Sequence, residues 1–137
     1  MTEFYEEAGY GLDRALAESA FTTLLSDERL GYVWLIEDDG KVVGHVVLTL
    51  RFGMEFGGMM ACVDDLFVVK ANRNKGLSTD ALDRVADFCE GAGIRAITVE
   101  VGIGNEPALA VYRRTGFVEV LGRQMLTLPL ATPTHIV

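Results

Sequence analysis

The sequence is short of the residues that build metal sites and disulfide frameworks. Its 137 residues include two cysteines and two histidines. Cys62 and Cys89 do not form a CxxC pair, and neither histidine lies near them in the sequence, so the chain offers no four-ligand set for zinc. We therefore expect two free, buried thiols and no metal cofactor.

Long apolar runs and basic residues are also scarce. No run approaches the ~18 residues of a membrane span, and the first ten residues, MTEFYEEAGY, are acidic where a secretory signal would be basic. The chain has 12 Lys and Arg against 20 Asp and Glu, a net charge of -8. Nucleic acids and anionic membranes attract basic surfaces, so neither is an expected partner. We expect a cytoplasmic protein that attracts cationic small molecules.

The composition is that of one globular domain. Hydrophobic residues make up 50% of the chain and charged residues 23%, which argues against disorder. A chain of this length forms about one domain, so we expect residues 1–137 to share a single core.

The hydrophobic pattern predicts a mixed α+β fold. Helices are expected over 11–26 and 75–90 and from Asn105 to Gly116; strands are expected over 32–36, 41–50, 60–69, 95–101, 117–121 and 123–128. The glycine-rich residues 51–59 are expected to form a loop. Helix 75–90 links two strands by a crossover, so those strands should be parallel neighbours in an otherwise antiparallel sheet.

A candidate anion site lies where strand 60–69 leads into helix 75–90. Gly76 and Ser78 are small residues at the start of the helix, where free N–H groups and the helix dipole favour an anion, and Arg73 and Lys75 add positive charge. A pyrophosphate fits this pattern. An ordinary turn with solvated basic residues fits it equally well.

A second motif follows about thirty residues later. The segment Arg73 to Ser78 reads R-x-x-G-x-S, and Asn105 to Phe117 reads N-x-x-A-x-x-x-Y-x-x-x-G-F. Together they resemble the GNAT superfamily of acetyl-CoA-dependent N-acetyltransferases, over about Tyr32 to Leu128. Ser78 stands where the family usually has Gly or Ala. The resemblance implies a mostly antiparallel sheet, with a parallel pair splayed at the acetyl-CoA site and helices on its flanks; the family's first strand has no evident counterpart here.

The resemblance also implies roles for particular residues. Tyr112 is the candidate acid that protonates the coenzyme thiolate, and it would contact the coenzyme, as would Asn105 at the pantetheine arm. The other expected coenzyme contacts are Leu66, Phe67, Val68, Arg73, Asn74, Lys75, Gly76, Leu77, Ser78 and Thr79. Tyr112 as a core tyrosine that anchors its helix is the alternative.

The attacking amine must lose a proton, because alkylamines titrate near 10. Asp64 is the preferred base and Asp65 the reserve. Adjacent strand residues point to opposite faces, so only one of them can serve a given side. Alternatively, both are hydrogen-bonded or exposed at a bulge.

The acceptor pocket is expected on segments that carry acidic and apolar residues. Glu6, Glu7, Tyr10 and Glu55 are the candidate acceptor contacts, with a solvated surface as the alternative. His45 is expected to be a satisfied strand histidine rather than a base. The apolar residues around Glu55 would line a dimer contact or pack in the core; they are Phe52, Met54, Phe56, Met59 and Met60.

The function that this resemblance implies is transfer of an acetyl group from acetyl-CoA to a primary amine of a small, cationic molecule. The attack would be direct, in a ternary complex. A non-catalytic acyl-CoA-binding or sensing module with the same fold is the alternative. A homodimer in which a partner chain completes each acceptor site is a further hypothesis.

Overall fold

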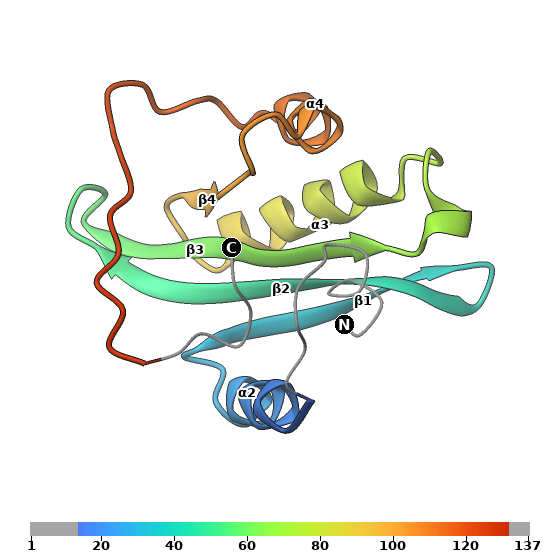
Figure 1. The fold of residues 1–137 in the computed structure, drawn as a ribbon, viewed down its shortest axis with the longest axis horizontal. Coiled ribbons are helices and arrows are strands. Elements are labelled where there is room, and N and C mark those ends of the chain that lie inside the picture. Colours follow the sequence, from blue (N-terminus) through green and yellow to red (C-terminus); the bar gives the residue numbers. More distant parts are fainter. Residues whose placement is uncertain (1–13, 132–137) are drawn as a thin grey trace.

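The computed structural model describes residues 14–131, which fold around one open sheet (Figure 1). The sheet has four strands in the order β1-β2-β3-β4. In chain order the elements are α2 (Arg14–Ser26), β1 (Gly31–Asp38), β2 (Lys41–Gly53), β3 (Gly58–Val68), the 3-10 turn η1 (Lys70–Asn72), α3 (Leu77–Gly91), β4 (Ile97–Val99) and α4 (Glu106–Arg114). The mixed α+β prediction is confirmed.

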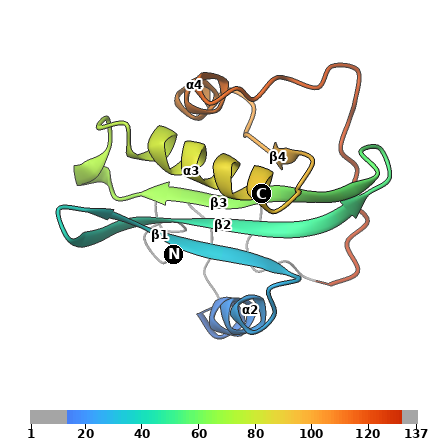
Figure 2. The same cartoon turned by 180° about the vertical axis from the view of Figure 1, so that it is seen from behind.

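The helices lie on both faces of the sheet. Both views place α3 and α4 on one face and α2 on the other (Figures 1 and 2). β1, β2 and β3 pair antiparallel, whereas β3 and β4 pair parallel, as the crossover through α3 predicts. The β1–β2 hairpin turns at Asp39 and Gly40, whose φ angles of 52° and 75° suit a tight Asp-Gly turn.

The core lies between the sheet and α3. Leu82, Val85 and Cys89 recur at helical spacing on one side of α3 and are buried. They pack against β2 and β3, where Val46 and Leu48 have no exposed surface. This packing fixes α3 along β3, so the start of the helix is held close to the end of that strand.

The expected loop over 51–59 is confirmed only for the turn at 54–57 and is wrong at both of its ends. β2 continues to Gly53, β3 begins at Gly58, and these two glycines are paired. A Cβ atom at Gly53 would lie 2.1 Å from the Met60 sulfur, and one at Gly58 would lie 2.7 Å from Arg95 Nε. The glycines therefore allow neighbouring side chains to lie against the strands, and they do not mark a loop.

The two last expected strands, 117–121 and 123–128, are also wrong. Described residues after Gly116 form no strand, and β4 covers only three residues of the expected 95–101. A strand is stable only when its backbone N–H and C=O groups pair with a neighbour. Among the described residues nothing pairs with the outer edge of β4, so the apolar pattern of these segments finds no sheet to join.

Candidate functional site

The site begins where β3 and β4 diverge. They pair only at Ala61 with Ile97, Cys62 with Thr98 and Val63 with Val99. On its other side β3 carries a bulge: Leu48 pairs with Val63 and Val47 with Asp65, so Asp64 has no partner on β2. From Asp64 to Val68, no strand within residues 14–131 pairs with the edge of β3 on the β4 side.

A cleft of about 410 Å³ opens along this free edge. Its walls come from the end of β3, the loop before α3, the first turn of α3, and α4. The lining residues are Leu66, Phe67, Val68, Asn72, Arg73, Asn74, Gly76, Leu77, Ser78, Thr79, Pro107, Ala108, Ala110, Val111, Tyr112 and Arg114. Ten of the twelve residues expected to contact the coenzyme are thus gathered in one cavity.

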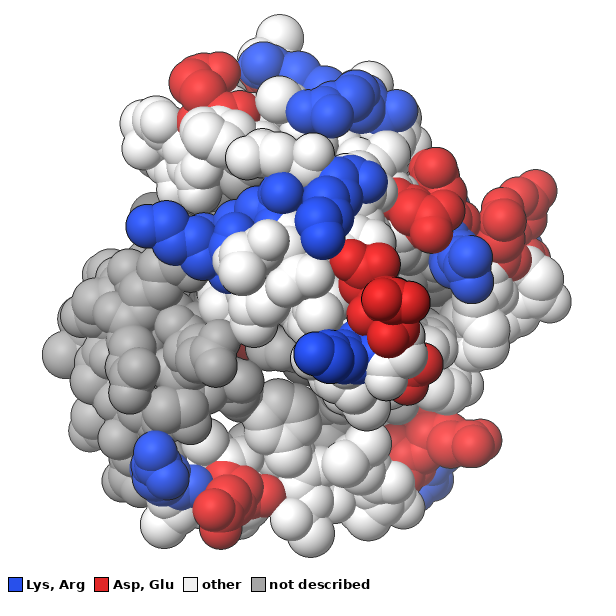
Figure 3. Space-filling model, turned by 90° about the vertical axis from the view of Figure 1, so that its right-hand side faces the viewer, with Lys and Arg blue, Asp and Glu red and all other residues white. Residues whose placement is uncertain are grey.

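The start of α3 forms an open anion site within this cleft. Gly76 is the N-cap in a left-handed conformation, with φ 77°, and no side chain caps the helix. The N–H groups of the first turn therefore remain available to a ligand, at the positive end of the helix dipole. Lys and Arg side chains gather on this end of the molecule, over α4 and the start of α3 (Figure 3). The arrangement suits a phosphate group.

Arg73 fixes the loop before α3 to the end of β3. Its Nε donates a 2.8 Å hydrogen bond to the Val68 carbonyl oxygen, and its guanidinium lies 5.3 Å from the centre of the Phe67 ring. These contacts hold the two walls of the cleft at a fixed spacing. A ligand that touches both walls meets a preformed site.

Lys75 and Asn105 are outside the cleft lining. Lys75 Nζ lies 3.3 Å from Asp38 Oδ2, and this contact, together with Asn72, lowers the pKa of the Asp38 carboxyl. Asn105 Oδ1 instead accepts a 3.3 Å hydrogen bond from the Ala108 N–H and so caps α4. Asn105 thereby orients the helix that carries Tyr112.

Tyr112 projects from α4 into the cleft lining. Burial, together with the nearby Cys62 and Asp65, raises the pKa of its phenol to about 12. The ring packs edge-on against Phe117, with centroids 5.4 Å apart. At neutral pH the phenol is therefore protonated and held in place, as a proton donor must be.

The bulge gives the two aspartates different environments. Asp64 is exposed, whereas Asp65 is half-buried opposite Val47, on the sheet face turned away from α3. Burial, together with the charge of Asp64, raises the pKa of Asp65 to about 6. Asp65 is thus the carboxylate poised to exchange a proton near neutral pH, and it is close enough to Tyr112 for the two to interact electrostatically.

The candidate acceptor contacts are not assembled at this cleft. Glu55 lies in the turn between β2 and β3, at the opposite end of β3 from Val68, and forms a bidentate pair with Arg123, at 2.8 and 3.1 Å. Glu6, Glu7 and Tyr10 lie outside the described residues. His45 is buried beside Phe67, and burial lowers its pKa to about 4, so it is neutral at physiological pH.

Sequence reasoning missed several residues of the cleft wall. Pro107, Ala108, Val111 and Arg114 line it from α4, and Asn72 lines it from the loop. Their three- and four-residue spacing on α4 places them on one side of the helix with Tyr112. That helical spacing is the sequence signal that could have identified the α4 residues of the cleft wall.

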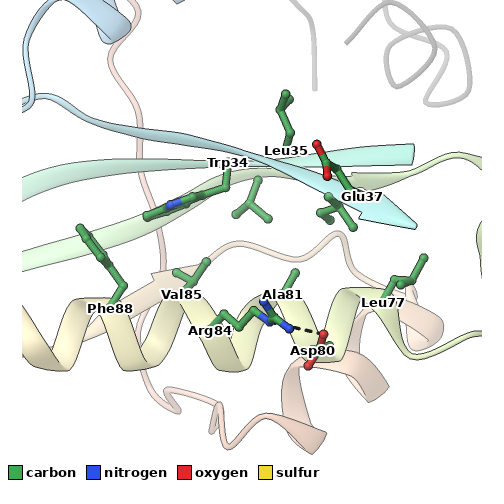
Figure 4. A pocket seen from close by; sticks show the side chains of 11 residues that line it. Trp34, Leu35, Glu37, Leu77, Asp80, Ala81, Arg84, Val85 and Phe88 are labelled. Atoms are coloured by element: carbon green, nitrogen blue, oxygen red, sulfur yellow. Dashed lines mark ion pairs between the residues drawn. The ribbon is translucent and has the colours of Figure 1, made fainter. Parts of the chain in front are cut away.

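A second cavity, of about 360 Å³, lies between α3 and β1 (Figure 4). Trp34, Val85 and Phe88 point into it, and Arg84 and Asp80 pair at its side with 3.5 Å between charged atoms. The Trp34 and Phe88 rings meet edge-on, 5.1 Å apart. Its lining includes Leu77, the first residue of α3, but not Gly76 or the loop before it, so it lacks the glycine turn that opens the anion site of the cleft.

Neither a metal cluster nor a membrane-spanning helix occurs in the part of the chain that the structure describes. No group of three or more His, Cys, Asp or Glu side chains there could hold a metal ion. None of its helices is both long and apolar enough to cross a bilayer. Cys62 and Cys89 are free thiols, as expected, but only Cys89 is fully buried.

Comparison with known proteins assigns the fold to a family. The model of the acetyltransferase (GNAT) family matches residues 1–117. The chain belongs to the GNAT family. An uncharacterized N-acetyltransferase of Bacillus subtilis is 27% identical over 88% of this chain and 78% of its own length. The N-alpha-acetyltransferase MAK3 of Arabidopsis thaliana is 30% identical over 64% of this chain and 47% of its own.

Solved structures share this fold. An integron cassette protein from the mobile metagenome of Cole Harbour Salt Marsh superposes with a TM-score of 0.85 at 45% identity, over 96% of this chain and 81% of its own. An aminoglycoside 6'-N-acetyltransferase of Acinetobacter haemolyticus shares the fold, with a TM-score of 0.71 at 16% identity, over 91% of this chain and 88% of its own.

The left-handed conformation of Gly76 gives a test of the loop. Gly76→Ala should lower the free energy of unfolding by about 1–2 kcal/mol, because a Cβ atom is strained at this φ angle. Gly91→Ala is the matched control: it ends the same helix without a positive φ and has open space around its Cα. The control should be neutral or slightly stabilising. Equal effects of both substitutions in urea unfolding would contradict the loop geometry.

Proposed function

We propose that the chain transfers an acetyl group from acetyl-CoA to a primary amine of a small, cationic molecule. One observation carries the proposal: the free edge of β3, the uncapped start of α3 and the phenol of Tyr112 line a single cleft. Membership in the GNAT family supports acyl transfer as the reaction. Direct attack by the amine needs no covalent enzyme intermediate.

The residues of the cleft fit acetyl-CoA along its length. The open N–H groups of Leu77, Ser78 and Thr79 would take the pyrophosphate, helped by the charge of Arg73. Leu66, Phe67 and Val68 would offer backbone groups to the pantetheine arm, in the manner of an added strand. Asn105 contributes by orienting α4 rather than by lining the cleft. The coenzyme supplies an acetyl thioester, a reactive acyl donor.

We assign the proton transfers to two residues. Asp65, whose pKa is raised to about 6, is ionised at neutral pH and would accept the proton of the incoming ammonium, directly or through water. Tyr112, whose pKa is raised to about 12, would donate its proton to the departing thiolate. Asp64, the residue first preferred as the base, is exposed beside the bulge and faces water.

The acceptor class rests on charge. With a net charge of -8 the protein attracts cations, which favours an amine that arrives protonated. The acetyltransferase from Acinetobacter haemolyticus that shares the fold acts on aminoglycosides by its name, but at 16% identity this likeness supports only the fold. Net charge affects the rate at which a charged acceptor meets the protein. Acceptors should therefore be compared as a series of increasing positive charge.

Coenzyme binding is the first expectation. Acetyl-CoA at a hundredfold excess over its Kd should stabilise the folded protein by about 2.7 kcal/mol, seen as a higher Tm. Amine acceptors should then release free thiol, with rates that rise with acceptor charge at low ionic strength. Adenosine is the control ligand, because it lacks both pyrophosphate and pantetheine. An unchanged Tm at millimolar acetyl-CoA would contradict the proposed function.

Tyr112→Phe tests the acid and separates the two functional hypotheses. The ring and its packing on Phe117 remain, so the Kd of acetyl-CoA should not change, whereas kcat should fall on the order of 10²-fold. Tyr32→Phe, at a tyrosine that stacks on Trp34 outside the cleft, should leave kcat unchanged. Thiol release that is absent in the wild type, despite tight coenzyme binding, would instead favour the non-catalytic binding module.

Asp65→Asn tests the base through pH. In the wild type, kcat/KM should fall below about pH 6, because the carboxylate must be ionised to accept a proton. Asp65→Asn should lose most activity, and its remaining kcat/KM should no longer fall below pH 6. Asp64→Asn, a substitution of the exposed neighbour, should keep both the activity and this fall at low pH. If Asp64→Asn removes the limb instead, the assignment of the base is reversed.

Asp65→Asn should lower activity but raise the free energy of unfolding. The pKa of Asp65 is higher in the folded protein than its ordinary value of 3.8, so its contribution to folding is fully present below about pH 4 and is lost as pH rises through 6. Asp65→Asn should therefore gain on the order of 1–2 kcal/mol over the wild type at pH 8, after allowance for partial solvent screening. The gain should vanish near pH 4.

A further inference from the structure

A carboxylate at the end of β1 contacts the loop that leads into α3. Asp38 Oδ2 accepts a 3.2 Å hydrogen bond from Asn72 Nδ2, and the same oxygen lies 3.3 Å from Lys75 Nζ. The contacts join positions that are 34 and 37 residues apart in the chain. Lys75 and Asn72 lower the pKa of the Asp38 carboxyl, so it is ionised at neutral pH. One side chain thus holds the loop on both sides of residues 73 and 74.

The loop between these two contacts has a backbone shape that needs support. Asn74 has a φ angle of 63° and Gly76 one of 77°. Glycine adopts this left-handed conformation freely, whereas another residue keeps it only where the surrounding contacts hold it. Both residues line the cleft just before the first turn of α3. Contacts that keep this backbone shape therefore also keep the shape of the anion site.

Two further contacts fix the first part of the loop. The Val69 N–H donates a 2.7 Å hydrogen bond to the Val43 carbonyl oxygen on β2, and Arg73 Nε bonds to the end of β3. Both contacts come before Asn74 in the chain. Lys75 comes after Asn74, so its contact with Asp38 connects the second part of the loop to the sheet.

The course of β1 explains why Asp38 reaches this loop. Trp34 and Ile36 precede Asp38 at two-residue spacing, which places the three side chains on one face of the strand. Ile36 is buried in the core with α3, and the Trp34 ring lies 5.1 Å from that of Phe88, near the end of the helix. β1 runs along α3, and its end lies near the start of the helix (Figure 4). Apolar contacts along α3 are thus followed by a carboxylate at the loop before it.

We propose that Asp38 is a positioning residue for the coenzyme: by holding Asn72 and Lys75, it keeps the loop before α3 in the shape that binds the pyrophosphate. This role rests on the proposed function, because it concerns the same cleft. Asp38 is not among the residues that line the cleft, so it acts through the loop. A loop that is already ordered binds without the entropic cost of ordering it, and loss of the two contacts therefore weakens binding.

The charge of Asp38 makes this role separable from a simple electrostatic effect. A carboxylate near an anion site repels the pyrophosphate, so removal of its charge alone should tighten binding of the coenzyme. Loss of the contacts to Asn72 and Lys75 should weaken it. The direction in which the Kd changes therefore distinguishes positioning from charge.

Asp38→Ala removes both contacts. The Kd of acetyl-CoA, measured by isothermal titration calorimetry, should rise about three- to tenfold, because exposed charged contacts are individually modest. Asp39→Asn is the matched control: it removes the same charge from the neighbouring residue, and Asn tolerates the φ of 52° at this position. Its Kd should be unchanged or slightly lower. Asp38→Asn keeps an oxygen that can accept the Asn72 hydrogen bond, so its Kd should lie between those of the wild type and Asp38→Ala.

Thiol-release kinetics give a second readout. In Asp38→Ala the KM for acetyl-CoA should rise with the Kd, whereas kcat should stay within about twofold, because the pyrophosphate is remote from the reacting thioester. Lys75→Met should raise the Kd in the wild type and have little further effect in Asp38→Ala. A lysine that contacted the pyrophosphate directly would have the same effect in both backgrounds, which would overturn the route through Lys75.

An unchanged or lower Kd in Asp38→Ala overturns the proposal, as does a rise of equal size in Asp39→Asn. Failure of the proposed function looks different, because the wild type itself would then not bind acetyl-CoA. Hydrogen exchange in the ligand-free protein tests the loop in either case. The amides of residues 72–77 should exchange at least about threefold faster in Asp38→Ala than in Asp39→Asn, because local opening becomes easier. Equal exchange rates would show that Asp38 does not hold the loop.

Discussion

The divergence of β3 and β4 is the constraint on which the site depends. Two parallel strands that stayed paired would use the backbone N–H and C=O groups of their facing edges for each other and leave no room for a ligand. Here the pairing lasts three residues, and a bulge at Asp64 interrupts the pairing of β3 with β2 just beyond it. The open edge beyond it meets the start of α3 and the side of α4, and the cleft is the space among them.

The same bulge separates the environments of two adjacent carboxylates. In a regular strand, Asp64 and Asp65 would simply face opposite sides. The extra residue leaves Asp64 unpaired in water and puts Asp65 in a partly buried position, where loss of solvation raises its pKa to about 6. Function and stability compete at such a position, because a carboxylate that is costly to ionise is also one that accepts a proton readily near neutral pH.

Much of the fold could be predicted because its cause is local. The hydrophobic pattern predicted α3, the two strands of the first hairpin and a helix that begins at Asn105. The residues expected around the coenzyme likewise meet in one cleft, since a strand, a turn and a helix start follow one another directly in the chain. The expected loop over 51–59 was too long, because Gly53 and Gly58 belong to paired strands and leave room for the Met60 and Arg95 side chains.

What the sequence by itself determined is the set of helices, the hairpin and the loop that opens α3, because these depend on spacing, caps and turn residues within a few positions of one another. Tertiary structure alone decided where strand pairing stops. It placed Asp65 rather than Asp64 in the buried environment, moved Glu55 away from the cleft to Arg123, and left residues 117–128 without a neighbouring strand. Each outcome depends on residues far away in the chain. The alternation of apolar and polar residues along a strand does not show which other segment that strand pairs with.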